Sequence, residues 1–417
     1  MAKIDDSVKK KVPELRFKGF TDDWEERKVG NFLSESKIKG SDGSVSKKLT
    51  VKLWRKGIVP KEEIYKGSSA TQYYIRLAGQ FMYGKLDFLN QAFGILPKEL
   101  DGYESTLDSP AFDFKDGINP NFFLEYVCQE NFYKYQGNIA NGSRKAKRIH
   151  ADTFFDMPIT IPSFEEQEKI GNFFKELDDA IALHQRKLDL LKEQKKGYLQ
   201  KMFPKNGAKV PELRFAGFAD DWEERKFFES IASTIDFRGR TPKKLGMDWS
   251  DSGYLALSAL NVKNGYIDPL ADAHYGDEKL YRKWMSGREL KKGQVLFTTE
   301  APMGNVAQVP DDNGYILSQR TVAFETKEDM MTNDFLAVLL KSPLVFNNLS
   351  ALSSGGTAKG VSQKSLKGLS ITVPLDIDEQ QKIGSFFKQL DDTIDLHQRK
   401  LDLLKEQKKG YLQKMFV

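Results

Sequence analysis

The stretch HQRKLDLLKEQKKGYLQKMF occupies residues 184–203, and the same twenty letters return at residues 397–416. A second repeat opens each half: VPELRFKGFTDDWEERK at 12–28 has a near copy, VPELRFAGFADDWEERK, at 210–226. A variable stretch separates each opening block from the repeated block that follows it. The chain therefore consists of one unit that occurs twice, and such internal repetition is the strongest indication of its architecture.

Each repeated block ends a long segment with a heptad pattern, which predicts two long helices, at 165–203 and 378–417. Ser163 before Glu166, and Asp376 before Glu379, predict a capping box or its Asp variant at the two starts. The positions expected to face a partner helix, which we call the seam, are Phe174, Leu177, Ile181, His184, Leu188, Leu191, Lys195, Tyr198 and Met202 in the first copy and Phe387, Leu390, Ile394, His397, Leu401, Leu404, Lys408, Tyr411 and Met415 in the second.

Each helix needs a partner for this narrow apolar stripe, and the other copy is the obvious one. A helix of about 39 residues is roughly 58 Å long. Because residues 210–375 link the end of one helix to the start of the other, and compact domains keep their termini close, we expect an antiparallel, pseudo-twofold pair with a variable domain at either end. His184 and His397 are then expected to meet near the axis, where polar residues fix register; a metal or catalytic role is the alternative.

The outward-facing residues of the two helices are also identical between the copies, which packing of the pair alone does not require. Two explanations remain open. Either one kind of partner docks twice, once on each side of the assembly, or the duplication is recent and has not yet diverged.

The two variable stretches differ in sequence but share short motifs at corresponding positions. Gly79-Gln80 corresponds to Gly293-Gln294, and the short apolar stretches around them, punctuated by Gly, Asn and Pro, indicate strands and turns with a few helices. The expected fold class is α+β, with two similar variable domains separated by the helix pair. The expected boundaries are 1–164 for the first domain, 165–203 for the first helix, 204–209 for a linker, 210–377 for the second domain and 378–417 for the second helix.

Composition sets the outer limits of the interpretation. A chain of 417 residues suits two domains, and its 40% hydrophobic and 12% aromatic content is that of a folded globular protein. It contains no run of roughly 18 apolar residues and no signal-like beginning, and its one cysteine, Cys128, lies in an apolar run. We therefore expect a buried structural thiol and a protein of the reducing cytoplasm.

Basic residues gather in loops on a chain whose net charge is only +5. Such local clusters are typical of a surface for a polyanion, although ordinary solvated surface is the alternative for any one of them. The candidate DNA-binding residues are Lys47, Lys48, Arg144, Lys145, Lys147, Arg148, Arg238, Arg240, Thr241, Lys243, Thr357 and Lys359.

No catalytic motif is found. The sequence lacks a phosphate-binding Gly-x-x-x-x-Gly-Lys-Ser/Thr loop, a dinucleotide fingerprint, a His-Glu-x-x-His zinc motif and a Gly-x-Ser-x-Gly elbow, and its four histidines are scattered. Paired carboxylates such as Asp178-Asp179 are interpreted as charged scaffold surface. We expect neither catalysis nor a bound metal or cofactor in this chain.

The duplicated openings, the EEQEKI and DEQQKI helix starts, and phrases such as YGKLDFLNQAFGILP (83–97), RGRTP (238–242), LNVKNGYI (260–267) and GQVLFTTEAPMGNVA (293–307) resemble the specificity subunits of type I restriction-modification systems. The resemblance covers almost the whole chain. It implies two target recognition domains that each read one half of a split, asymmetric DNA sequence. It also implies two methyltransferase subunits and the motor-nuclease (restriction) subunits as partners, with S-adenosylmethionine, ATP and Mg²⁺ bound by those partners.

Two other functions remain open at this stage. One is a structural adaptor that joins two protein partners without contacting DNA. The other is a two-headed DNA-binding regulator that acts without a methyltransferase. Basic loops in both variable domains argue against the adaptor, and tight binding to a split site by the chain alone would favour the regulator.

Overall fold

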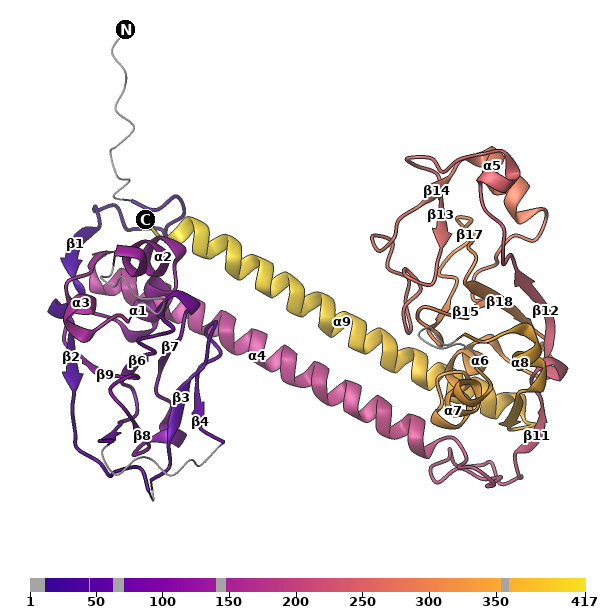
Figure 1. Cartoon of the computed structure of the whole chain (residues 1–417), viewed down its shortest axis with the longest axis horizontal. Helices are drawn as coiled ribbons and strands as arrows, with labels where there is room; N and C mark the ends of the chain where they lie inside the picture. Colours follow the sequence, from indigo (N-terminus) through magenta and orange to yellow (C-terminus); the bar gives the residue numbers. More distant parts are fainter. Residues whose placement is uncertain (1–11, 45, 63–70, 140–147, 354–359) are drawn as a thin grey trace, which may run out of the picture. The chain divides into compact units, whose positions relative to one another are not determined.

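The computed structural model describes residues 12–44, 46–62, 71–139, 148–353 and 360–417, and divides the chain into two compact units. Unit 1 is Met1–His184 with Lys400–Val417, and unit 2 is Gln185–Arg399. Both long helices, α4 (Phe164–Lys201) and α9 (Ile377–Met415), contribute to each unit (Figure 1). Each unit is therefore made from segments that lie far apart in the sequence.

Unit 1 is built on a four-stranded antiparallel sheet with strand order β2-β9-β6-β7. Its strands are β1 (Glu25–Lys28), β2 (Leu33–Ser36), β3 (Leu49–Val51), β4 (Ile58–Pro60), β5 (Tyr74–Ile75), β6 (Phe81–Tyr83), β7 (Phe93–Ile95), β8 (Glu104–Ser105), β9 (Ala111–Phe114) and β10 (Pro158–Ile161). Its short helices are α1 (Pro120–Val127), α2 (Glu130–Ile139) and α3 (Ala151–Phe155). Strands β1 and β10, β3 and β4, and β5 and β8 form three further pairs.

The core of unit 1 is aromatic. The rings of Phe81 and Phe123 meet edge-on at 5.1 Å, and Phe154 packs on the same sheet face, so that these side chains are fully buried. Burial of each such ring contributes about 2–3 kcal/mol. Cys128 lies in this core, as expected, and burial raises the pKa of its thiol to about 12.

Unit 2 has the same topology in its main sheet as unit 1 but a different amino-acid sequence. Its four-stranded sheet has the strand order β12-β18-β15-β16. Its strands are β11 (Glu223–Lys226), β12 (Ile231–Asp236), β13 (Tyr254–Leu257), β14 (Tyr275–Gly276), β15 (Val295–Thr298), β16 (Val306–Gln308), β17 (Ile316–Leu317), β18 (Thr321–Thr326) and β19 (Ser370–Val373). Its short helices are α5 (Glu278–Met285), α6 (Asn333–Leu339), α7 (Pro343–Leu352) and α8 (Gln363–Gly368).

The sequence landmarks take the same backbone role in both units. Gly79 and Gly293 both have positive φ, 85° and 83°, a conformation that glycine adopts at little cost. Their N–H groups donate to the carbonyls of Leu96 and Val309, both at 2.9 Å. Each glycine therefore makes the same turn into the central strand that follows it, β6 or β15.

The opening blocks are structural, and each fixes the start of a long helix. Arg16 donates two hydrogen bonds to Glu166 at 2.6 and 2.7 Å, and Arg214 binds Glu379 in the same way at 2.6 and 2.8 Å. The capping-box expectation is therefore half wrong. Ser163 accepts a 3.4 Å bond from the Glu166 N–H, but the glutamate side chains turn away to the arginines, because a bidentate charged pair is stronger than a bond back to the helix start.

Within each unit the two long helices contact each other with opposite chain directions. In unit 1, Phe173 meets Tyr411 at 5.0 Å and Asp178 binds Lys408 at 2.6 Å. In unit 2, Tyr198 meets Phe386 at 5.0 Å. Lys195 also pairs with Asp391 there, so the paired carboxylates are not merely surface.

The seam is largely withdrawn from solvent. Phe174, Leu188, Leu191, Phe387, Leu401 and Leu404 are buried, and Leu177, Ile181, His184, Tyr198, Leu390, Ile394, His397 and Tyr411 are partly exposed. In contrast, Leu183, Leu190, Leu396 and Leu403, which lie off the seam, are 47–65% exposed. The predicted meeting of His184 and His397 stays a prediction, because the two residues belong to different units.

Candidate nucleic-acid interface

A hairpin in unit 1 concentrates positive charge. Residues 46–61, which include strands β3 and β4, contain six basic residues and no acidic one. Lys47 is exposed, with its ammonium 5.7 Å from the centre of the Tyr103 ring. Lys48 is only 8% exposed and lies 4.9 Å from the Tyr73 ring. The geometry therefore supports Lys47 as a phosphate contact, whereas Lys48 packs into the domain because neighbouring residues of an extended chain point to opposite sides.

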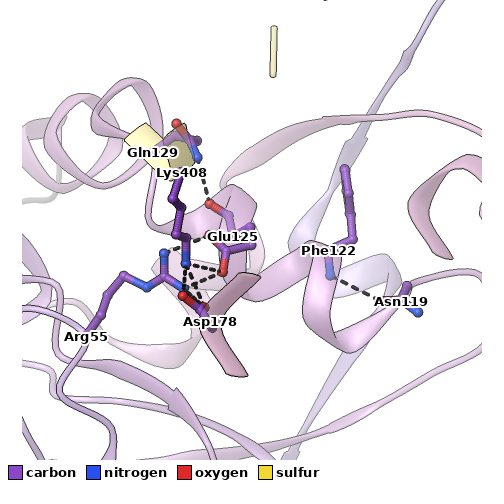
Figure 2. A network of polar contacts seen from close by, with 7 residues as sticks. All are labelled: Arg55, Asn119, Phe122, Glu125, Gln129, Asp178 and Lys408. Atoms are coloured by element: carbon purple, nitrogen blue, oxygen red, sulfur yellow. Dashed lines mark hydrogen bonds and ion pairs between the residues drawn. The ribbon is translucent and has the colours of Figure 1, made fainter. Parts of the chain in front are cut away.

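Arg55, at the turn of this hairpin, points into unit 1 rather than to solvent (Figure 2). Its guanidinium binds Glu125 of α1 and lies 3.6 Å from Asp178 of α4, while Lys408 of α9 binds the same two carboxylates at 3.2 and 2.6 Å. Burial would raise the pKa of Glu125, but the two cations outweigh it and lower that pKa. Two cations thus neutralise two carboxylates, and the network fixes the hairpin to the helices.

The second basic cluster of unit 1 is described only at its end. Arg148 is half-exposed and forms a 3.1 Å ion pair with Asp108, which is equally exposed. Such a surface pair is weak and can open for another anion. Arg144, Lys145 and Lys147 lie outside the described residues, as do Thr357 and Lys359 of unit 2.

In unit 2, the basic loop after β12 is ordered by its own side chains. Arg238 binds Asp236 at 2.7–2.8 Å and also donates to the carbonyl of Val361 at 3.3 Å. Burial would raise the pKa of Asp236, but the bonds from Arg238 lower it, so this pair stays ionised at neutral pH. Arg238 keeps 35% of its side chain exposed, although part of its charge is already satisfied.

Arg240 belongs to a cluster of two arginines that share one ring. Arg240 and Arg288 lie 4.3 and 4.6 Å from the centre of Phe237, and Arg240 also donates to the Trp284 carbonyl. Burial, together with the charge of Arg288, lowers the pKa of Arg240. Among the described residues neither arginine has a carboxylate within ion-pair distance, and two like charges held together in this way favour an incoming anion. Arg288 was not predicted, although basic residues lie on both sides of it in the sequence, at positions 282, 283, 291 and 292.

A cavity of about 340 Å³ opens beside this loop. Thr241 and Lys243 line it, together with Trp249, His274 and Gln319, which the sequence did not single out, and with two carboxylates, Asp248 and Asp272. A neighbouring hollow of about 400 Å³ shares Gln319 with it. Lysine, amide and aromatic groups around one concave surface are the groups that contact phosphates and base edges.

A larger cavity, of about 840 Å³, lies in unit 1. Asp23, Glu25 and Glu26 line it, against the single basic side chain of Arg27. Both cavities have more carboxylates than lysine or arginine side chains, but only the cavity of unit 2 adjoins a predicted basic loop, so we do not assign the DNA surface to the larger cavity.

Among the described residues, no group of three or more His, Cys, Asp or Glu side chains could hold a metal ion. No single helix there is long and apolar enough to cross a membrane; one bent pair, α6 with α7, reaches the required length and composition only in combination.

Comparison with known proteins agrees with this geometry. A family model described as the type I restriction modification DNA specificity domain matches residues 111–193 and 220–406. The putative type I restriction enzyme MjaX specificity subunit of Methanocaldococcus jannaschii is 22% identical over 307 residues, which are 71% of this chain and 67% of that protein. The MjaVIII specificity subunit of the same organism is 24% identical over 305 residues, 71% of this chain and 69% of that protein.

A solved structure shows the same fold. The S subunit of a type I restriction-modification system from M. genitalium superposes with a TM-score of 0.63 at 11% identity, covering 97% of this chain and 99% of that chain. The chain therefore belongs to the family of type I restriction-modification specificity subunits, which recognise DNA and are not themselves catalytic.

Proposed function

We propose that this specificity subunit reads a bipartite, asymmetric DNA target, with one half read by the domain at 1–164 and the other by the domain at 210–377. The observation that carries the proposal is the repeated frame. The two units build the same four-stranded sheet, yet their basic loops differ in sequence and in structure. A protein that recognises two different half-sites requires two domains with the same fold and different DNA-facing surfaces.

We further propose that α4 and α9 form one antiparallel, pseudo-twofold coiled coil that sets the distance between the half-sites. The buried seam residues and the opposite chain directions within each unit support this. Helices of 38 and 39 residues are about 57–59 Å long, whereas half-sites on one face of DNA are separated by roughly 34 Å or a multiple of it. A rod of this length can therefore hold two readers apart.

The phosphate contacts that we propose are those whose charge remains available. The candidates in unit 1 are Lys47 and Arg148. The candidates in unit 2 are Arg240 and Lys243; Arg238 contributes less, because part of its charge is satisfied by Asp236. Base edges would be read by neighbouring polar side chains such as Gln319 and Thr241.

The off-seam leucines support docking of one kind of partner on both helices. Leu183 and Leu190 are 65% and 51% exposed, and their copies Leu396 and Leu403 are 65% and 47% exposed. Exposed leucines repeated at the same positions suit a protein that binds twice. We assign these surfaces to two adenine methyltransferase subunits, with the motor-nuclease subunits joining them. S-adenosylmethionine, ATP and Mg²⁺ then bind in the partners.

Comparison of adenine methylation in a genome with and without the gene tests the proposal. We expect one split motif, with two fixed halves and an unspecified spacer, to lose methylation when the gene is deleted. Replacement of residues 229–374 by the corresponding stretch of another specificity subunit should change only one half of the motif. A motif that is continuous, or that changes in both halves, would contradict the assignment of one half-site to each domain.

Filter binding separates this function from the two alternatives. A specificity subunit should bind its target selectively when the methyltransferase is present. Equal selectivity by the chain alone would favour a regulator, and no DNA binding under either condition would favour a structural adaptor.

A further inference from the structure

Each unit exposes one aromatic ring at the tip of a turn beside a long helix. In unit 1 the turn is residues 52–57, between β3 and β4, and Trp54 at its tip is 56% exposed. In unit 2 the turn is residues 262–267, closed by a bridge between Val262 and Ile267, and Tyr266 is 53% exposed. We call these turns tip 1 and tip 2.

Tip 1 holds its tryptophan in a conformation that bulky residues rarely adopt. Trp54 and Arg55 have positive φ, 58° and 56°, which costs on the order of 1–3 kcal/mol per residue. The N–H groups of these two residues donate to the carbonyls of Asn90 and Gln91 at 2.8 and 3.0 Å. The Arg55 side chain is anchored in the network of Glu125, Asp178 and Lys408 (Figure 2). The tip is thus rigid, and its indole ring stays outside the core.

Tip 2 occupies the corresponding place in its own unit by other means. The Gly265 N–H donates to the Val306 carbonyl at 2.8 Å, at the start of edge strand β16. A Cβ on Gly265 would lie 3.6 Å from a carboxylate oxygen of Asp391. Asp391 is the copy of Asp178 in the repeated helix, so each tip rests beside the same helix position.

Both tips carry an aromatic ring beside lysine, although their sequences, KLWRKG in tip 1 and VKNGYI in tip 2, share no aligned residue. Lys52 and Lys56 flank Trp54, and Lys263 precedes Tyr266. Neither residues 46–61 nor residues 259–267 contain an acidic side chain. The neighbouring carboxylates, Asp178 and Asp391, are already paired with Lys408 and Lys195.

This combination favours one occupant. A protein partner that is present in two identical copies would meet identical residues, as we propose for the repeated helices. The DNA backbone is chemically uniform, so it requires only the same chemistry, which is positive charge for phosphates and an apolar ring for deoxyribose. Charge complementarity therefore favours DNA over a second protein.

We propose that Trp54 and Tyr266, with Lys52, Lys56 and Lys263, form two sequence-independent contacts to the DNA backbone. The inference rests on the proposed DNA-reading function and adds to it, because these contacts increase affinity for any duplex while the base-reading loops select the target.

The test uses the complex with methyltransferase and a random-sequence 40-base-pair duplex, since the contact does not depend on sequence. Trp54→Ala and Tyr266→Ala should each weaken binding about fivefold, the size of a contact worth roughly 1 kcal/mol. Lys52→Gln with Lys56→Gln should reduce the slope of log affinity against log salt by about 2. Tyr135→Ala is the matched control, because Tyr135 is 65% exposed but lines the acidic cavity, and it should bind as the wild type does.

Photo-crosslinking keeps the result independent of stability. A benzoylphenylalanine at position 54 or 266 should crosslink to a DNA strand. Crosslinking to the methyltransferase, or loss of complex assembly in Trp54→Ala, would show a protein interface and overturn the inference. If the wild-type complex binds DNA and both alanine variants bind it with the same affinity, the inference is overturned. Failure of the wild-type complex to bind any duplex would instead reject the proposed function and this inference together.

Discussion

Lys341 and Cys128 occupy corresponding positions, each nine residues after the N-cap of the matching helix, Thr332 or Asn119. Both face the repeated helices, but only Lys341 brings a charge there. It lies 3.5 Å from Asp391, which already pairs with Lys195, and its side chain is 12% exposed. Burial, and then the charge of Lys195, lower the pKa of Lys341 to about 8.

Lys341→Met should therefore stabilise the protein at neutral pH. Because the folded-state pKa is about 8 and the ordinary pKa of lysine is 10.5, the unfolded state binds more protons between these values, and wild-type stability rises with pH across this window. We expect the variant to be more stable by about 1–3 kcal/mol at pH 7, with a difference that shrinks toward pH 10.5. Denaturant unfolding at several pH values measures this. Lys388→Met, at a lysine that is 58% exposed, is the control and should leave the stability at pH 7 almost unchanged.

The network of Arg55, Glu125, Asp178 and Lys408 predicts strong coupling between Arg55 and Glu125. Glu125→Leu should cost about 3–5 kcal/mol, because Arg55 is left with only the more distant Asp178. The double change with Arg55→Leu should cost less than Glu125→Leu alone, since no uncompensated buried cation remains. A double-mutant cycle by chemical denaturation measures the coupling, and additive costs would show that the pair is not coupled.

At this scale the sequence predicts poorly which charges are available. Lys47 and Lys48 are adjacent residues of the same type, yet Lys47 is exposed whereas Lys48 is only 8% exposed. Arg55 belongs to the same basic run, but its partners Glu125 and Asp178 are 70 and 123 residues away. Such pairings depend on tertiary contacts, which no local pattern encodes.

Two glycines of the long helices allow a short helix to approach closely. A Cβ on Gly171 of α4 would lie 2.5 Å from the Asn119 side chain and 2.9 Å from the Phe122 nitrogen, at the start of α1. Gly384 of α9 meets α6 in the same way, with Phe335 N at 2.8 Å. By contrast, Gly410, also in unit 1, has nothing within 4 Å of an added Cβ.

Gly171→Ala and Gly410→Ala should consequently have opposite effects. We expect Gly171→Ala to destabilise by about 1–3 kcal/mol, because α1 has to move away. Gly410→Ala should stabilise by up to about 1 kcal/mol through helix propensity. Thermal unfolding of the two variants and of their counterparts, Gly384→Ala and Gly197→Ala, checks the contrast in both units. Equal effects at positions 171 and 410 would contradict the close packing.

Element-scale features were the most predictable part of the fold. The expected helices at 165–203 and 378–417 are observed at Phe164–Lys201 and Ile377–Met415, because a heptad pattern sustained over many turns leaves little freedom. The small sheets could not be predicted: unit 1 has two-stranded sheets where unit 2 has a three-stranded sheet and helix α5. Strands of two to four residues are too short to show a periodicity.

At the scale of the whole molecule, the proposed coiled coil depends on the two helices keeping one register. The ion pairs Asp178–Lys408 and Lys195–Asp391 between the long helices lie outside residues 185–191 and 398–404, which are corresponding heptads of the two copies. Deletion of both heptads therefore preserves these pairs and the seam pattern, whereas deletion of one heptad alone mismatches them.

The double deletion should bring the two domains about 10 Å closer, since seven residues of helix span roughly 10.5 Å. Spin labels on cysteines placed at the exposed positions Tyr135 and Leu270 would report the distance by pulsed electron resonance. Cys128 should stay unlabelled, because it is buried and its pKa is raised to about 12. The single deletion should broaden the distance distribution instead. If the double deletion leaves the distance unchanged, the helices do not hold the domains apart, and the spacer of the DNA target must be set by another part of the complex.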